Sequence, residues 1–150
     1  MQPEFTDIEP DHALFENGSA EQARFIDALV ATVHENERPL AGLSGLLDWR
    51  FHGAISRGLR SGTITGAIGE CVYLPISKNG STYRLILAGA GKSSRPGERS
   101  ALPIDSLRAL QKNLASLRLS SVGISRQDFG SPPEEFFAKN LKGLPLKVLP

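Results

Sequence analysis

The most constraining feature of this sequence is an amphipathic stretch that begins near Arg38 and runs to Arg60. Its apolar residues recur at the three- and four-residue spacing that turns one side of a helix toward a core. These residues are Leu43, Leu46, Leu47, Phe51, Ala54, Ile55 and Leu59. Pro39 suits a helix entrance, because a missing backbone donor costs little there. The stretch therefore predicts helix up to Arg60, and the glycines of segment 62–69 then predict a turn into a strand.

Two shorter segments predict a hairpin of strands. Residues 71–76 and 83–88 are rich in apolar and β-branched side chains, and Lys78-Asn79-Gly80-Ser81 lies between them. Asparagine followed by glycine is typical of a tight two-residue turn between antiparallel strands. We therefore expect an antiparallel pair.

The second half of the chain continues the alternation of helix and strand. Residues 104–118 follow Pro103 with a leucine-rich face, which predicts a helix, and residues 121–124 suit a short strand. Ser131 stands three residues before Glu134, the spacing of a capping box, so a short helix is expected before Gly143. This order indicates an α/β domain with a mixed sheet between helices.

Three strings in the first half resemble the N-terminal domain of the leucyl aminopeptidase (M17 metallopeptidase) family. That family follows a strand with Asp/Glu-Arg-Pro-Leu-x-Gly, then Gly-Leu-x-Asp-Trp-Arg, then a helix and a Gly-Glu pair that opens the next strand. The matching strings are Glu37-Arg38-Pro39-Leu40-Ala41-Gly42, Gly45-Leu46-Leu47-Asp48-Trp49-Arg50 and Thr65-Gly66-Ala67-Ile68-Gly69-Glu70. The resemblance covers residues 25–143. In the family a large catalytic domain with two metal ions follows this region, whereas here the sequence continues only to Pro150. The resemblance therefore implies a freestanding relative of the N-terminal domain.

The resemblance also implies a fold and a domain division. Residues 25–33 satisfy helical spacing, yet the corresponding family segment is a buried strand, and a dense apolar run is typical of one. The implied fold class is α/β, a three-layer α/β/α sandwich with a mixed sheet, similar to macro domains. Residues 1–24 are expected to form an acidic, loosely ordered arm, and residues 25–150 the M17 N-terminal-like domain.

Composition excludes several classes of protein. The chain has 150 residues, of which 40% are hydrophobic and 22% charged, as expected for one globular domain. The sequence holds neither an apolar run of about 18 residues nor a secretory start, so we expect a cytoplasmic protein. The single cysteine, Cys71, lies in a predicted strand and is interpreted as a buried thiol.

The sequence contains no complete enzyme motif. Gly89-Ala90-Gly91-Lys92-Ser93 superficially resembles a phosphate-binding loop, but Ile86 stands where that loop needs glycine, so the string is interpreted as a glycine-rich strand exit. His12, His34 and His52 are scattered in sequence and predict no metal site. The metal-ligand string of the aminopeptidases, Asn-Thr-Asp-Ala-Glu-Gly-Arg, is absent. We therefore expect no catalytic residues, no metal, no cofactor and no peptidase activity.

The similarity to macro domains, many of which bind ADP-ribose, implies a possible ligand site. Residues 26–30 match the start of the macro-domain strand, and Asp27 would accept a hydrogen bond from an adenine amine. The asparagine-containing end of that motif is missing, which argues against removal of ADP-ribose. Under this hypothesis Asp27, Gly89 and Gly91 are the ligand contacts.

The leading hypothesis is protein association or regulation, because the corresponding domain of the aminopeptidases serves assembly more than chemistry. The expected partners are a second copy of this chain or an M17 aminopeptidase. Trp49 and Arg50 are candidate interface residues, although a helical tryptophan more often packs on a sheet. Phe136 and Phe137 point about 100° apart on a helix, so one of them, Phe137, is a further candidate.

A third hypothesis follows from the distribution of charge. Residues 1–75 hold 11 acids and 5 arginines, whereas residues 76–150 hold 5 acids and 12 bases. In this hypothesis the basic half forms a nucleic-acid surface. The alternative is that the acidic and basic halves attract each other within one fold.

Overall fold

The computed structural model describes residues 2–15, 25–95 and 97–150. Its strands are β1 Glu4–Phe5, β2 Ala28–His34, β3 Cys71–Lys78, β4 Ser81–Gly91, β5 Val122–Ser125 and β6 Leu146–Leu149. Its helices are α1 Pro10–Phe15, α2 Gly42–Arg50, α3 Ala54–Ser61, α4 Ile104–Leu117, the 3-10 helix η1 Gln127–Phe129 and α5 Glu135–Asn140.

The strands of the described residues form one mixed sheet in the order β1-β6-β5-β2-β4-β3. The neighbours from β1 to β4 are parallel, and β3 runs antiparallel to β4 at one edge. β2 lies inside the sheet, and all seven of its residues are buried. Burial on both faces explains why its sequence is a dense apolar run rather than an alternating one. A strand is confirmed here, although β2 spans Ala28–His34 rather than the expected residues 25–33.

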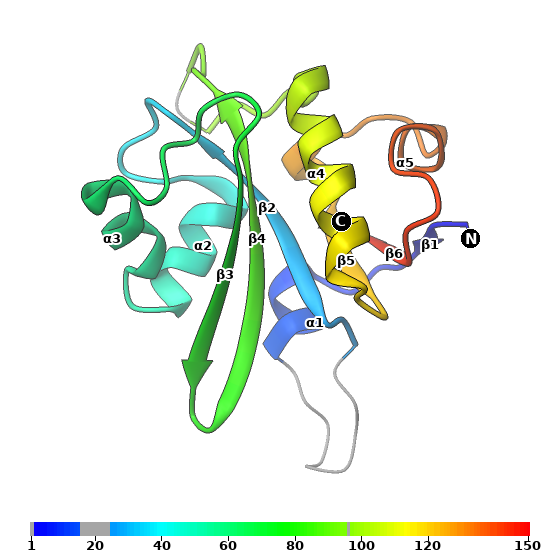
Figure 1. Cartoon of the computed structure of the whole chain (residues 1–150), viewed down its shortest axis with the longest axis horizontal. Helices are drawn as coiled ribbons and strands as arrows, with labels where there is room; N and C mark the ends of the chain where they lie inside the picture. Colours follow the sequence, from blue (N-terminus) through cyan, green and yellow to red (C-terminus); the bar gives the residue numbers. More distant parts are fainter. Residues whose placement is uncertain (1, 16–24, 96) are drawn as a thin grey trace.

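Helices cover both faces of the sheet (Figure 1). Leu29, Ala31 and Val33 of β2 point toward α1, α2 and α3, whereas Ala28 and Val30 point toward α4, η1 and α5. This alternation follows from the two-residue period of a strand, which sends successive side chains to opposite faces. The predicted α/β/α sandwich with a mixed sheet is confirmed.

The amphipathic stretch forms two helices, which corrects the expectation of uninterrupted helix up to Arg60. Gly53 adopts φ 81°, a left-handed conformation, between α2 and α3, and His52 beside it adopts φ 54°. Helical backbone does not continue through such residues. Pro39 is likewise outside the helix, because α2 begins only at Gly42.

The predicted hairpin of β3 and β4 is confirmed. Lys78 pairs with Ser81 across a two-residue turn, in which Asn79 and Gly80 have φ of 52° and 78°. Positive φ at both central positions is what this turn requires. β3 is an edge strand, and Pro75 lies within it opposite Arg84.

The other half of the chain agrees with prediction except at one cap. The helix expected over residues 104–118 is α4, and the strand expected at 121–124 is β5. The capping box at Ser131 is wrong, because Ser131 adopts φ 51° and no side chain caps α5, which begins at Glu135. Every helix of the described residues is too short or too polar to span a bilayer.

The sequence did not predict three elements at the ends of the chain. Within the acidic arm, β1 pairs with β6, and α1 buries Pro10, Ala13 and Leu14. The acidic N-terminal segment therefore packs on a strand of the basic half. The rest of the expected arm, residues 16–24, lies outside the described residues.

Candidate functional site

A polar cavity lies at the carboxyl ends of the parallel strands. The chain leaves β2 toward α2 on one face of the sheet and leaves β4 toward α4 on the other (Figure 1). Such a divergence opens a crevice between adjacent strand ends, which is where open α/β sheets bind ligands. The cavity there has a volume of about 260 Å³. Its wall is formed by Thr32, His34, Ile68, Ala90, Lys92, Ser93, Ser94, Glu98, Ser100, Ala101, Leu102, Pro103 and Asp128.

His34, the last residue of β2, holds a buried polar atom of this wall that the described residues leave unpaired. Its side chain is buried, and Nδ1 lies 3.2 Å from the carbonyl oxygen of Gly91. A carbonyl only accepts hydrogen bonds, so Nδ1 carries the proton and, in the neutral ring, Nε2 is an acceptor. Within the described chain, Nε2 is buried and has no hydrogen-bond partner. A buried acceptor left unpaired costs free energy, so a ligand donor at this point would be stabilising.

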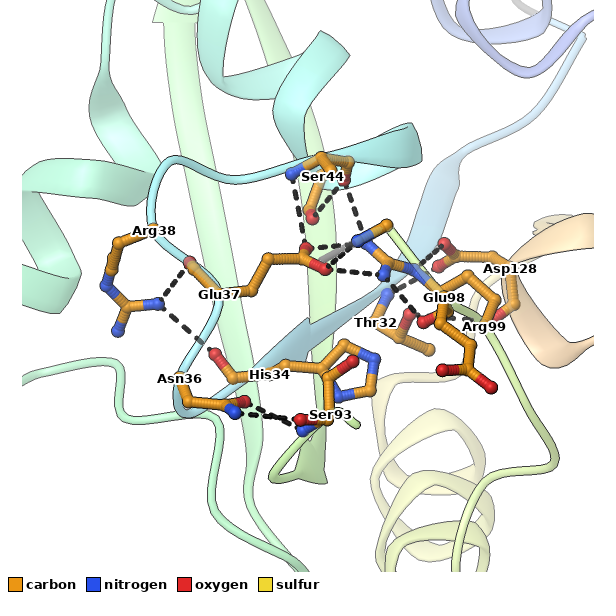
Figure 2. Close-up of polar contacts among 12 residues, drawn as sticks. Thr32, His34, Asn36, Glu37, Arg38, Ser44, Ser93, Glu98, Arg99 and Asp128 are labelled. Carbon is orange, nitrogen blue, oxygen red and sulfur yellow. Dashed lines mark hydrogen bonds and ion pairs between the residues drawn. The ribbon is translucent and has the colours of Figure 1, made fainter. Parts of the chain in front are cut away.

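At the rim of the cavity, two hydrogen bonds between Asn36 and Ser93 join two loops. The amide nitrogen of Asn36 donates to the Ser93 carbonyl at 2.8 Å, and the Ser93 N–H donates to the Asn36 side-chain oxygen at 2.7 Å. These bonds hold the loop after β2 against the loop after β4 (Figure 2). Lys92, next to Ser93 in the chain, is exposed and brings a positive charge to the rim.

Behind the cavity, Arg99 joins two buried carboxylates (Figure 2). Its guanidinium nitrogens lie 2.8 and 2.9 Å from the oxygens of Glu37, and its Nε lies 3.3 Å from Asp128. Glu37 also accepts the backbone N–H groups of Ala41 and Gly97. The Glu37 carboxylate thus fixes the start of α2 and the loop before α4 relative to β2.

The two carboxylates have opposite pKa shifts. Burial acts to raise the pKa of Glu37, but hydrogen bonds from Arg99, Gly97 and Ala41 outweigh it and lower this pKa to about 2. For Asp128 burial prevails over its bonds from Thr32 and Arg99, and the pKa is raised. Hydrogen bonding to the charged form thus prevails at Glu37, and desolvation prevails at Asp128, although both carboxylates contact the same arginine.

A second cavity, of about 380 Å³, lies against Arg99 and Asp128, residues of the same network. Its remaining wall comes from α1, α2, the ends of β5 and β6, η1 and the loop before α4. The residues are Glu9, Pro10, Asp11, Gly42, Leu43, Leu46, Gly97, Ser125, Gln127 and Pro150. Asp128 lines both cavities.

The three predicted ligand contacts are not brought together. Asp27 lies just before β2, at the end opposite the cavity, where its carboxylate accepts the N–H and hydroxyl of Ser120. Burial acts to raise its pKa, yet these bonds hold the pKa below the usual value. At the other end of the sheet, Gly91 supplies the carbonyl that His34 binds.

Gly89 is covered by the loop that contains the third family string. A Cβ built on Gly89 would stand 1.9 Å from the Ala67 carbonyl oxygen, so only glycine fits beneath this loop. The loop is held by the Glu70 carboxylate, which receives the Thr65 N–H at 2.8 Å, and by the Gly89 N–H, which donates to the Glu70 carbonyl. The glycine has a packing role that the sequence alone did not show.

The three interface candidates differ in their exposure to solvent. Trp49 is 74% exposed on α2, contrary to the commoner packing of such a residue on the sheet. Arg50 stacks its guanidinium 4.1 Å from the centroid of the Phe15 ring. Phe137 is fully buried between Phe129 and Phe136, so it cannot form part of a contact surface.

Other reactive groups are accounted for by their surroundings. Cys71, expected to be buried, is half-buried in the edge strand β3. Burial of the thiol, together with the Glu70 charge, raises the pKa of Cys71 to about 11, which keeps this thiol protonated at neutral pH. The described residues include no group of three or more His, Cys, Asp or Glu side chains placed to hold a metal ion.

Sequence reasoning missed the residues that form the site. In the sequence His34 is an isolated histidine, and Glu37 stands out only as part of a family string. That string was the one sequence signal for the site, because the acid before Arg-Pro-Leu is Glu37, which Arg99 binds. Arg99 and Asp128 lie in a loop and a 3-10 helix, far from Glu37 in sequence.

The fold defines a class of protein: an α/β domain of the macrodomain type. The macrodomain of Mycobacterium tuberculosis DarG superposes with a TM-score of 0.65 at 16% identity, covering 99% of this chain and 97% of that one. That of Thermus aquaticus DarG gives 0.63 at 15% identity, with 99% and 96% covered. Tomato leucine aminopeptidase gives 0.55 at 15% identity, where this chain is fully covered and spans 32% of the other.

The sequence then assigns the family. Residues 29–129 match the model of the cytosol aminopeptidase family, N-terminal domain, and the chain belongs to that family. A probable cytosol aminopeptidase of Pseudomonas syringae pv. tomato is 30% identical over 105 residues, which are 67% of this chain. The chain spans about a fifth of that relative's length, because the match covers 21% of it.

Proposed function

We propose that this chain is a noncatalytic binding domain whose polar cavity holds a small ligand rich in hydroxyl groups and bearing an anionic group. A ribose phosphate, alone or as part of a nucleotide such as ADP-ribose, has this chemistry. The observation that carries the proposal is the unpartnered Nε2 of His34, buried in the wall of a cavity at the strand ends.

The lining of the cavity supports this ligand chemistry. The hydroxyl groups of Ser94 and Ser100 can both donate and accept, as sugar hydroxyls require, and the acceptor at His34 suits a hydroxyl donor. The Ser93 hydroxyl donates to the Arg95 carbonyl and can only accept from a ligand. Lys92 at the rim supplies a cation for a phosphate. Similarity to DarG macrodomains concerns the fold alone, and the ligand is inferred from these side chains.

The size of the cavity restricts which part of a nucleotide enters. Small-molecule pockets usually enclose about 300–1,000 Å³, whereas this cavity encloses about 260 Å³. We therefore place one sugar or one phosphate group inside, with the rest of a larger ligand over the rim. The contacts expected from the sequence are replaced in this proposal by His34, Lys92 and Ser93.

The proposal is tested by thermal shift and calorimetry with ADP-ribose, AMP, ribose 5-phosphate and inorganic phosphate. In His34→Asn the amide nitrogen can still donate to Gly91, but the acceptor at the Nε2 position is lost. One hydrogen bond is worth about 0.5–1.5 kcal/mol, so we expect a roughly 2- to 10-fold weaker Kd.

A matched pair of lysine variants tests the anionic group. Lys92→Ala should weaken phosphate-bearing ligands severalfold, while Lys112→Ala, which removes an exposed cation from α4, should leave the Kd unchanged. Absence of any response to the four compounds would refute ligand binding. Equal affinity in His34→Asn and the unchanged protein would refute the assignment of Nε2.

A second candidate function, association with another copy or with an M17 aminopeptidase, is favoured by one observation. Trp49 is 74% exposed and lies within the segment that matches the family model. Exposed tryptophan is uncommon and is enriched at interfaces. The name of the Pseudomonas relative, a cytosol aminopeptidase, supports cytoplasmic residence for the same complex.

Light scattering with size-exclusion chromatography tests this second candidate, with the protein alone and mixed with an aminopeptidase of the family. A mass above that of the monomer, or co-elution with the enzyme, is expected. Monomeric elution in both samples would remove this candidate and would leave the ligand proposal untouched.

A further inference from the structure

The end of α2 carries an apolar and cationic surface outside the polar cavity. Trp49 is 74% exposed, and Leu46, one turn earlier on the same helix, is 39% exposed. Residues three apart on a helix are surface neighbours. A bulky aromatic beside an aliphatic side chain is the composition of an interface anchor.

Beside this apolar pair is a notch of about 240 Å³, lined by Trp49, Arg50, His52 and Lys78. Arginine, histidine and lysine side chains thus surround the tryptophan. The acid that precedes it in sequence, Asp48, is already engaged, because its oxygens accept the backbone N–H of Ser56 at 2.9 Å and its hydroxyl at 2.5 Å. The notch therefore favours a negatively charged group from outside the domain.

Arg50 has a hydrogen-bonding group that this domain leaves unused. Its guanidinium stacks over the Phe15 ring, and its carbonyl accepts a 2.7 Å bond from the Lys78 ammonium. Its Nε–H is buried and makes no hydrogen bond within the described chain. A carboxylate would satisfy this donor in a charge-assisted bond.

The small number of cations at this site favours a protein over a nucleic acid. Lys78 is bonded to the Arg50 carbonyl, and the guanidinium of Arg57 donates to the His52 carbonyl at 2.6 Å. Both cations thus donate hydrogen bonds to carbonyls at the end of α2 or just after it. Following a phosphate backbone requires a row of available cations, whereas one carboxylate beside an apolar residue requires only this notch and the neighbouring Leu46.

We propose that the notch of Trp49, Arg50, His52 and Lys78 receives a Glu or Asp side chain of a partner protein, while an adjacent apolar residue of that partner covers Trp49 and Leu46. The proposal rests on the association function and names the chemistry of the partner segment.

Trp49 is the single tryptophan of the chain, so its fluorescence reports directly on this surface. The probe is an acetylated peptide of alternating Leu and Glu, and the matched peptide has Gln in place of Glu. We expect a saturable change in Trp49 emission with the Glu peptide and a Kd at least tenfold weaker with the Gln peptide.

Variants locate the binding. Arg50→Gln should weaken the Glu peptide about tenfold, whereas Arg108→Gln, an exposed position on α4, should not change the Kd. Trp49→Ala, at an exposed position, should abolish binding of a fluorescein-labelled peptide without loss of thermal stability, which covers the case in which Arg50→Gln fails to fold.

Three outcomes overturn the proposal: no response to the Glu peptide, equal affinity for the Gln peptide, or tighter binding of an oligothymidine strand. The sizing experiment separates these failures from failure of association. If association is observed but survives Trp49→Ala and Arg50→Gln, the partner binds elsewhere and only the notch is refuted.

Discussion

The loop after β2 and the 3-10 helix after β5 each give Arg99 a buried carboxylate, but the two carboxylates are held differently. Glu37 receives two backbone N–H groups and two guanidinium nitrogens. Asp128 receives one N–H from Thr32 and one longer contact from Arg99. The pKa of Glu37 is lowered to about 2, whereas burial raises that of Asp128. The balance between the number of donors and burial, more than the nearness of the arginine, decides which carboxylate is stabilised in its charged form.

The largest effect is expected from removing the residue that the two carboxylates share. Arg99→Met leaves Glu37 buried without its cation, and such a break costs about 3–5 kcal/mol of unfolding free energy. Urea denaturation measures it, with Arg108→Met on the exposed face of α4 as a control that should change stability by less than about 0.5 kcal/mol. A loss below about 1 kcal/mol would show that Arg99 is not the centre of the network.

Glu37→Gln should cost less than the arginine variant but more than any change at Asp128. The amide keeps the size of the side chain but loses the charge-assisted bonds to Arg99, for an expected loss of about 2–3 kcal/mol. Urea denaturation at pH 7 gives the value. Equal losses for Glu37→Gln and Asp128→Asn would contradict the difference drawn between the two carboxylates.

The pH dependence of stability should follow Glu37. Its pKa is lowered in the folded state from the ordinary 4.5 to about 2, so its contribution is complete above about pH 4.5 and is lost as the pH falls toward 2. The raised pKa of Asp128 acts in the opposite direction, because its ionisation disfavours folding. Melting temperatures between pH 5 and 2.5 should fall in the unchanged protein and fall less in Glu37→Gln. Parallel profiles would assign the acid sensitivity to other groups.

The smallest effect is expected from Asp128→Asn. The amide oxygen can still accept the Thr32 N–H, and the substitution removes a charge that burial disfavours, so less than about 1 kcal/mol should be lost at pH 7. Because Asp128 lines both cavities, the variant also shows whether this carboxyl contacts a ligand. A loss above about 2 kcal/mol would mean that Asp128 is stabilised as strongly as Glu37.

The layers of the fold could be predicted from local patterns, because apolar periodicity and turn residues act over a few positions. The hairpin at Asn79-Gly80 and the leucine face of α4 are of this kind. Gly53 did provide a local signal for the break between α2 and α3, but the continuing apolar spacing concealed it. The six residues of α1 are too few to show a helical period among acidic neighbours.

The candidate site could not be predicted in the same way. Glu37, Arg99 and Asp128 come from three separate loops or turns, and only the sheet brings them together. Spacing along the chain also could not decide between Phe136 and Phe137, since a helix alone does not show which side faces the core. The orientation of α5 against η1 settles it by burying Phe137.

Pro75 restricts how sheets of this protein can join. The two-residue turn makes Lys78 and Ser81 a hydrogen-bonded pair, and the alternation along β3 then directs the backbone of Pro75 outward, away from β4. Proline has no N–H, so a strand of another molecule that added to the free edge of β3 would find no backbone donor at Pro75. Growth of the sheet into fibrils or strand-swapped assemblies is disfavoured on that side.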